Sequence, residues 1–156
     1  MSKSVKRVAK AALNIGLEIE ITRMGQSTRT AEEAAAACGC SVAQIVKSMI
    51  FQAEKTGDLV LLLISGANQA DLEKSAAVVG EPLVRAKPED VRAQTGFAIG
   101  GVSPIGHLKA PRIWMDRDLL SFGKVWAAAG APDAVFQIAP EDLAKATGAT
   151  IASLAR

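Results

Sequence analysis

The segment from Gly100 to His107, with the sequence GGVSPIGH, holds three glycines, one proline and the only histidine of the chain. Glycine reaches backbone conformations that other residues avoid, and proline stiffens a loop by fixing φ. Such a loop can present backbone N–H groups to an anion or to the oxyanion of a tetrahedral intermediate. The same composition is typical of a tight turn between strands, so the loop by itself leaves both interpretations open.

Lys47 is the second residue with possible chemistry. Read as a β-strand, the apolar segment around it places Lys47 on one face with Ile45 and Met49. Because an unpaired charge is costly to bury, this side chain either extends to the edge of the sheet or points into a cleft that holds an anion. Ser48 would point to the opposite face, which argues against a Ser–Lys nucleophilic pair.

Other catalytic patterns are poorly represented. A Ser-His-Asp triad would have to use His107, and no G-x-S-x-G elbow, Walker A motif or dinucleotide fingerprint occurs. Cys38 and Cys40, with a single histidine in the chain, fall short of a tetrahedral zinc site unless carboxylates complete it. We interpret them as packed free thiols. Neither a metal nor a cofactor is expected.

Composition limits the class of protein. The 156 residues are 49% hydrophobic, which fits one globular domain over residues 1–156 and excludes disorder. With 18 basic and 16 acidic residues and no Tyr, the chain is no polybasic protein and has no platform for stacking many bases, so a nucleic-acid partner would be contacted over a short piece. No apolar run approaches the ~20 residues of a membrane span, and no signal-peptide pattern opens the chain. These features predict a cytoplasmic protein without a membrane partner.

The chain pattern predicts an α+β fold with interspersed helices and strands. Two hairpins force antiparallel pairs, so we expect a mixed, mostly antiparallel sheet, strongly curved or barrel-like, with helices outside; a doubly wound fold is disfavoured. Capping boxes at Thr30 with Glu33 and at Ser41 with Gln44 mark two helix starts, and Asn68 can cap another. Helices are predicted at 5–13, 31–38, 69–79, 88–95 and 140–147, and strands at 17–22, 46–51, 59–65, 83–86, 112–116, 124–128 and 134–138.

Taken together, several segments resemble the YbaK/ProX-type aminoacyl-tRNA deacylases, relatives of the editing domain inserted in bacterial prolyl-tRNA synthetases. The similarity covers roughly residues 20 to 150. It is carried by Thr30–Ala35, Gln44–Phe51, Ile64–Leu72 and Phe97–His107. No single segment is specific for this family. The strand around Lys47, the S-G-x-N-x-x-D-L segment and the G-G-V-x-P-x-G-H loop, in this order, are fairly specific for it together.

The resemblance implies hydrolysis of the ester that links a wrong amino acid to the 3′ end of a tRNA, chiefly tRNA for proline carrying alanine or another small amino acid. Cysteine, serine, threonine and 2-aminobutyrate stay open as targets. The acceptor end of the tRNA is the implied partner, with a prolyl-tRNA synthetase as a further candidate. The implied catalytic residues are Lys47, Gly100, Gly101 and His107, and the implied pocket residues are Thr30, Ser65, Asn68, Val102, Ser103, Pro104 and Gly106.

In this reading His107 positions other groups rather than serving in a triad, although a base role stays open because histidine titrates near neutral pH. Two other functions remain as alternatives. One is a non-catalytic module that binds a small amino acid or aminoacyl-nucleotide, or docks on a synthetase. The other is a hydrolase of a different small ester.

Overall fold

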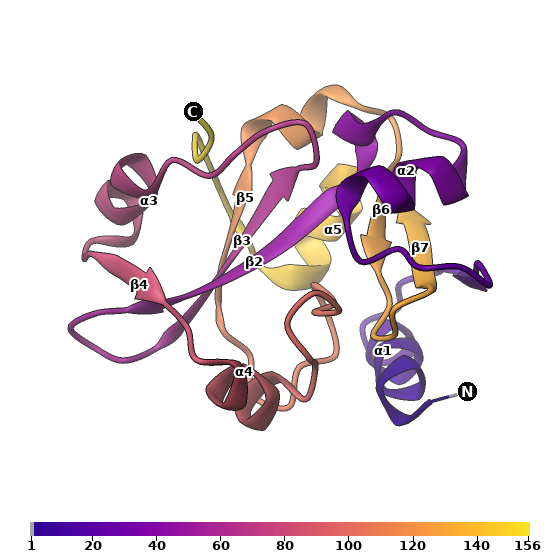
Figure 1. The fold of residues 1–156 in the computed structure, drawn as a ribbon, viewed down its shortest axis with the longest axis horizontal. Helices are drawn as coiled ribbons and strands as arrows, with labels where there is room; N and C mark the ends of the chain where they lie inside the picture. The colour runs from indigo at the N-terminus through magenta and orange to yellow at the C-terminus, as the bar shows by residue number, and fades with distance from the viewer. Residues whose placement is uncertain (1) are drawn as a thin grey trace.

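Two long strands cross the middle of the molecule in the computed structural model, which describes residues 2–156 (Figure 1). β2 (Val46–Ala53) pairs antiparallel with β3 (Leu59–Ser65), in the register Val46↔Ser65 to Gln52↔Leu59. Every residue of β3 is buried, because both faces of this strand are covered. This explains its continuous apolar sequence. β2 and β3 belong to a five-stranded sheet of order β4-β2-β3-β5-β8, completed by β4 (Leu83–Arg85), β5 (Arg112–Asp116) and β8 (Thr150–Ala152).

A second, three-stranded sheet lies beside the first. It has the order β1-β7-β6, all antiparallel, with β1 (Ile21–Arg23), β6 (Val125–Ala128) and β7 (Ala134–Ile138). A parallel bridge between Ile45 and Trp126 connects the two sheets where β2 begins. The predicted α+β class and the two hairpins are confirmed, although within residues 2–156 the strands form two sheets rather than one closed barrel. The pairs of β3 with β5 and of β5 with β8 are parallel.

The helices surround these sheets, as the sequence predicted (Figure 1). Both predicted capping boxes form, at Thr30 with Glu33 and at Ser41 with Gln44. No helix within residues 2–156 is both long and apolar enough to cross a membrane. The α-helices are α1 (Lys3–Asn14), α2 (Ala31–Cys38), α3 (Leu72–Val79), α4 (Pro88–Thr95) and α5 (Pro140–Thr147), and the 3-10 turns are η1 (Val42–Gln44) and η2 (Arg117–Ser121).

Two predicted boundaries were wrong by three residues or more, and strand β8 was not predicted. The strand expected at 17–22 is reduced to Ile21–Arg23, because Leu17 and Ile19 pack against the core without pairing to another strand. The helix expected after Asn68 begins at Leu72, since the carboxylate of Asp71 caps it by accepting from the backbone N–H groups of residues 73 and 74. The segment between β3 and α3 is therefore a turn, and this turn contacts Lys47.

Candidate active site

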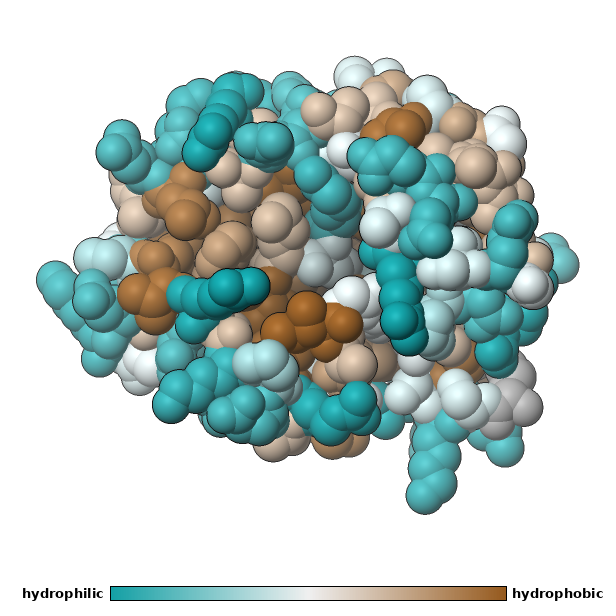
Figure 2. Space-filling view, in the orientation of Figure 1, coloured by the Kyte–Doolittle hydropathy of each residue, from teal (hydrophilic) through white to brown (hydrophobic). Residues whose placement is uncertain are grey.

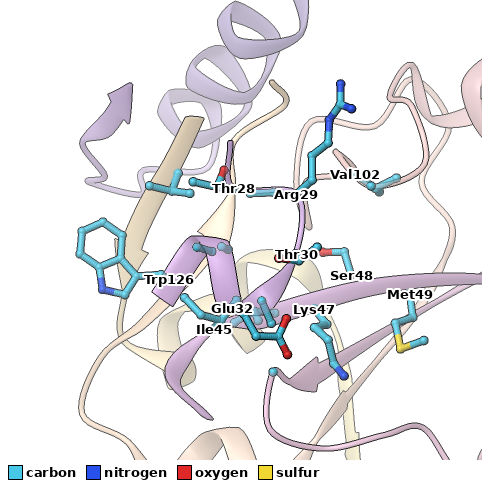
Figure 3. Close-up of a pocket in the computed structure, with 18 residues that line it drawn as sticks. Thr28, Arg29, Thr30, Glu32, Ile45, Lys47, Ser48, Met49, Val102 and Trp126 are labelled. Atoms are coloured by element: carbon cyan, nitrogen blue, oxygen red, sulfur yellow. The ribbon is translucent and has the colours of Figure 1, made fainter. Parts of the chain in front are cut away.

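A cavity of about 350 Å³ lies where β2 separates from the second sheet (Figure 3). Its walls come from five regions that are distant in sequence: α2 with the segment before it, the first half of β2, the residue after β3, the glycine-rich loop, and the hairpin of β6 and β7. Many lining residues are small, which leaves the space. The lining comprises Thr28, Arg29, Thr30, Ala31, Glu32, Ala34, Ile45, Val46, Lys47, Ser48, Met49, Gly66, Gly100, Val102, Trp126, Ala127, Ala128 and Val135.

Lys47 reaches this cavity from β2. Its Nζ donates a hydrogen bond to the backbone carbonyl of Asn68, in the turn that follows β3. Within residues 2–156 no carboxylate lies close enough to form an ion pair with Lys47. Glu32 and Arg29 both line this cavity. The side chain of Glu32 lies on the side of Lys47, whereas that of Arg29 points away from Lys47 (Figure 3). The amine is thus oriented by a neutral carbonyl, which leaves its charge available to an anionic or polar ligand.

The backbone of β2 adds further polar groups to the cavity wall. The N–H of Gly66 donates to the carbonyl of Ile45 at 2.7 Å, so the odd-numbered residues of β2 bond toward β3. Alternation in an antiparallel ladder then directs the N–H and C=O groups of Ser48 to the opposite edge. In the described part of the chain β4 pairs with that edge only at residues 51–53. Between β4 and the bridge of Ile45 to Trp126, β2 therefore offers a free backbone edge at Ser48, beside Lys47.

The glycine-rich loop meets the cavity at one end. Gly100 and Val102 line it together with Lys47, so the two segments singled out in the sequence face one space. Gly100 has φ +88°, a left-handed conformation that favours glycine, and a Cβ built on it would meet no atom within 4 Å. The N–H of Gly101 donates to the carbonyl of Ala98 at 2.9 Å and closes a turn. Gly100 is exposed and Gly101 is half-buried, so this end of the loop is free to approach a ligand, whereas Val102 is buried against the wall.

The other end of the loop, Ser103 to His107, is packed away from the cavity. Ser103, Pro104 and Ile105 are buried, and the Ser103 hydroxyl accepts from the N–H of Ile105. Pro104, Gly106 and His107 line a separate depression that faces α1 and α5. These loop residues therefore share a segment with the cavity wall without lining the cavity themselves.

His107 is held inside this packed end. Its Nε2 lies 2.7 Å from the carbonyl of Ser103, so this nitrogen carries the proton and donates it. Its ring meets Phe97 edge-on at a centroid distance of 5.7 Å. Burial lowers the pKa of His107 to about 4, against the opposing effect of the Ser103 carbonyl and with a smaller lowering by Arg7. His107 is therefore neutral at neutral pH and does not line the cavity.

Arg7 of α1 holds the two ends of the segment that contains the loop. Its guanidinium donates to the carbonyls of Gly96 and Gly106, both at 2.8 Å, and lies 4.8 Å from the centre of the Phe97 ring. Gly106 has φ +84°, and a Cβ there would come within 3.1 Å of the Cα of Val8. The close approach of α1 thus fixes the packed end of the loop.

The remaining predicted pocket residues take different places. Thr30 lines the cavity and caps α2. Ser65 is buried, and its hydroxyl donates to the carbonyl of Ala43 at 2.7 Å, which supports the wall rather than forming it. Asn68 contributes its carbonyl to Lys47, while its side chain donates to Asp118 at 2.8 Å.

Sequence reasoning missed several lining residues. Ser48 lies beside Lys47 on the same cavity although the two side chains leave β2 on opposite faces, because the cavity follows the free edge of the strand. Gly66 was recognised only as part of a motif, and its structural role was not. A Cβ at this position would lie 2.4 Å from the carbonyl oxygen of Val42, so only glycine lets the end of β3 approach η1. Trp126, on the far side of the cavity from Lys47, gave no sequence signal (Figure 3).

The two cysteines stand outside this cavity. Both are free thiols, as interpreted from the sequence. Burial, with a contribution from neighbouring Cys40, raises the pKa of Cys38 to about 11, so it is a poor thiolate nucleophile.

Comparison with known proteins points to one family. The sequence model of the aminoacyl-tRNA editing domain matches residues 26–146. A crystal structure assigned as a trans-editing enzyme for prolyl-tRNA synthetase has 46% identity and a TM-score of 0.93, covering 100% of this chain and 99% of that one.

Two curated relatives agree. EbsC of Enterococcus faecalis, named for deacylation of Cys-tRNA(Pro) and Cys-tRNA(Cys), is 29% identical over 126 residues, covering 80% of this chain and 76% of EbsC. The proline–tRNA ligase of Limosilactobacillus fermentum is 34% identical over 124 residues, covering 76% of this chain but only 21% of the ligase. This chain thus corresponds to one part of that synthetase.

The fold and the cavity define an α+β domain that offers a small space between a lysine and a glycine-rich loop. The chain belongs to the aminoacyl-tRNA editing domain family. The resemblance seen in the sequence is confirmed, and with it the class of enzyme, an aminoacyl-tRNA deacylase.

Proposed function

We propose that this deacylase acts in trans on tRNA for proline that carries alanine or a similarly small amino acid, and that it does so in the cytoplasm as a single domain. The observation that carries the proposal is the shared cavity. Lys47, Gly100 and Val102, which come from distant segments, line one space of about 350 Å³. That space can hold a small acyl group between a positive charge and the backbone of the glycine-rich loop.

The reaction needs little from the protein beyond positioning and charge stabilisation, because an aminoacyl ester is already activated. A water oxygen adds to the ester carbonyl. The tetrahedral intermediate then collapses as the bond to the ribose oxygen breaks, and that oxygen leaves with a proton. The backbone N–H groups of Gly100 and Val102, with Lys47 opposite, would stabilise the negative oxygen of the intermediate, whereas the N–H of Gly101 is engaged by the Ala98 carbonyl.

Within the described chain, neither a histidine nor a cysteine lines the cavity. This supports a mechanism without a histidine base and without a cysteine nucleophile. The family resemblance supplies the remaining component, the ribose hydroxyl of the substrate, which would orient the attacking water. His107 would act by holding the loop in place.

We propose that the size of the cavity determines which amino acid is removed. Ala31, Ala34, Ala127 and Ala128 form much of its wall. Larger side chains at these positions would fill it, so we propose that the alanines set the upper size of the acyl group. A pocket that excludes by size complements a synthetase, because binding alone separates neighbours that differ by one methylene by only ~1–3 kcal/mol.

The test is deacylation of tRNA for proline charged separately with alanine, cysteine, serine and proline. Fast loss of alanine with slow loss of proline is the expected result. Equal rates for all four would refute the size argument. Saturable binding without turnover would favour a binding module, and cleavage of free amino-acid esters but of no charged tRNA would favour another esterase. Adding a prolyl-tRNA synthetase to the assay would show whether it acts as a partner.

A further inference from the structure

We propose that a second groove, on the other side of Lys47, binds the 3′-terminal adenosine of the tRNA, with Arg156 facing its 5′-phosphate. This inference rests on the proposed function, since it assigns the nucleotide half of that substrate. The groove has a volume of about 280 Å³ and is lined by Lys47, Met49, Phe51, Gln69 and Arg156, among others.

The groove is continuous with the acyl cavity, because Lys47 and Met49 line both. In an aminoacyl-adenosine the ribose lies between the amino acid and the base. A substrate whose amino acid occupies the first cavity would therefore place its ribose beside Lys47 and its base in the groove.

The floor of the groove is apolar and includes an aromatic ring. Met49 and Phe51 share the face of Lys47 on β2, and both side chains are only half-buried. Figure 2 shows apolar side chains gathered over β2, β4 and α3, surrounded by hydrophilic ones. An aromatic and thioether surface accepts the flat face of a base by stacking. One aromatic ring suits one base, in keeping with the short contact that the composition allows.

The backbone of Arg156 is held at the rim of the groove. Its backbone N–H donates to the carbonyl of Gln69 at 3.1 Å, and Ala155 pairs with Ala70. Upstream, the carboxylate of Asp116, 1% exposed, accepts from the N–H groups of Leu154 and Ala155 at 2.7 and 3.3 Å. A buried carboxylate thus anchors the segment that carries Arg156.

The charge of Arg156 is available to a ligand. Its side chain is exposed, and in the described residues no carboxylate pairs with it. Lys47 and Arg156 both line the groove, so a nucleotide phosphate would meet two positive charges there. An uncharged ligand would not make use of that pair.

The test uses two stable substrate analogues. The first is 3′-amino-3′-deoxyadenosine that carries alanine through an amide bond. The second extends it by a 5′-linked cytidylate and so adds the phosphate. Binding is measured by calorimetry with the wild type, Phe51→Leu, Arg156→Ala and the control Arg92→Ala, since Arg92 is exposed on α4 and lines neither cavity.

We expect Phe51→Leu to weaken both analogues about tenfold through lost stacking. Arg156→Ala should weaken only the phosphate-bearing analogue, by about tenfold, and should lower its salt slope by about 0.7. Arg92→Ala should bind both as the wild type does. If neither groove variant changes binding, or if Arg156→Ala weakens both analogues equally, the assignment of the groove is overturned.

These measurements distinguish failure of the groove assignment from failure of the proposed function. If the wild type cleaves no mischarged tRNA yet the two variants show the expected split, the groove stands and the deacylase proposal falls. If the wild type cleaves alanine from tRNA but the variants bind the analogues unchanged, the deacylase stands and the groove falls. A melting curve of Phe51→Leu separates lost binding from lost folding.

Discussion

The two ends of the glycine-rich loop differ in what surrounds them. Gly100 and Val102 line the cavity opposite Lys47, whereas Pro104, Gly106 and His107 pack toward α1 and α5. Both ends have the residue types expected of a catalytic loop, yet only the first is placed to touch a substrate. The comparison shows that a loop can contain an active half and an anchoring half, and that the lone histidine belongs to the anchor.

The largest expected effect is on the active side. Lys47→Ala should lower kcat/KM for deacylation by about 100-fold or more, as removal of one group that stabilises an oxyanion does. The melting temperature should stay close to that of the wild type, because Lys47 is half-buried and its one hydrogen bond is to the Asn68 carbonyl. Lys10→Ala, an exposed lysine on α1, is the control. Full activity in a well-folded Lys47→Ala protein would remove this residue from the mechanism.

The anchoring side should respond to pH. Folding lowers the pKa of His107 from 6.5 to about 4, so between these values the unfolded chain binds the proton more tightly. The stabilisation is complete above pH 6.5 and is lost as the pH falls toward 4, by about 3 kcal/mol in total. Urea unfolding at a series of pH values measures this.

His107→Gln, which can still donate to the Ser103 carbonyl, should flatten the stability profile in that window. It should leave kcat at pH 7 within a few-fold of the wild type. A loss of kcat at pH 7 far beyond a few-fold in a well-folded His107→Gln protein would instead assign the histidine to catalysis.

Two glycines sharpen the contrast within the loop. Gly106→Ala adds a Cβ within 3.1 Å of the Cα of Val8 in a left-handed conformation and should cost about 2 kcal/mol of stability or more. Gly100→Ala meets no atom within 4 Å and should cost about 1 kcal/mol, from backbone strain alone. Thermal unfolding of both variants tests this order, and equal costs would contradict the anchoring role of Gly106.

The smallest effect is expected at two buried serines. Among the described residues the hydroxyls of Ser48 and Ser75 are buried and have no hydrogen-bond partner. Ser48→Ala and Ser75→Ala should therefore both be as stable as the wild type to within about 0.5 kcal/mol, or slightly more stable. Deacylation should persist in both. Loss of activity in Ser48→Ala alone would revive a Ser–Lys nucleophile, because only Ser48 lines the cavity.

Much of the fold could be predicted from local signals. The capping boxes at Thr30 and Ser41, and the hairpin that joins β2 to β3, are properties of short segments and appear as expected. The start of α3 was misplaced because Asp71 and Asn68 are both good caps, and sequence alone does not choose between them. The contact of the Asn68 carbonyl with Lys47 belongs to this turn.

The sequence by itself determined the family, through several motifs in one order, and the α+β class, through hydrophobic periodicity. That Lys47 and the glycine-rich loop share a pocket was a hypothesis that the family resemblance implied. Only the tertiary structure decided which residues of those segments reach the cavity. The free edge of β2 brings Ser48 beside Lys47, and the packing of α1 turns His107 away. Both outcomes depend on how distant elements pack against each other, which no local pattern encodes.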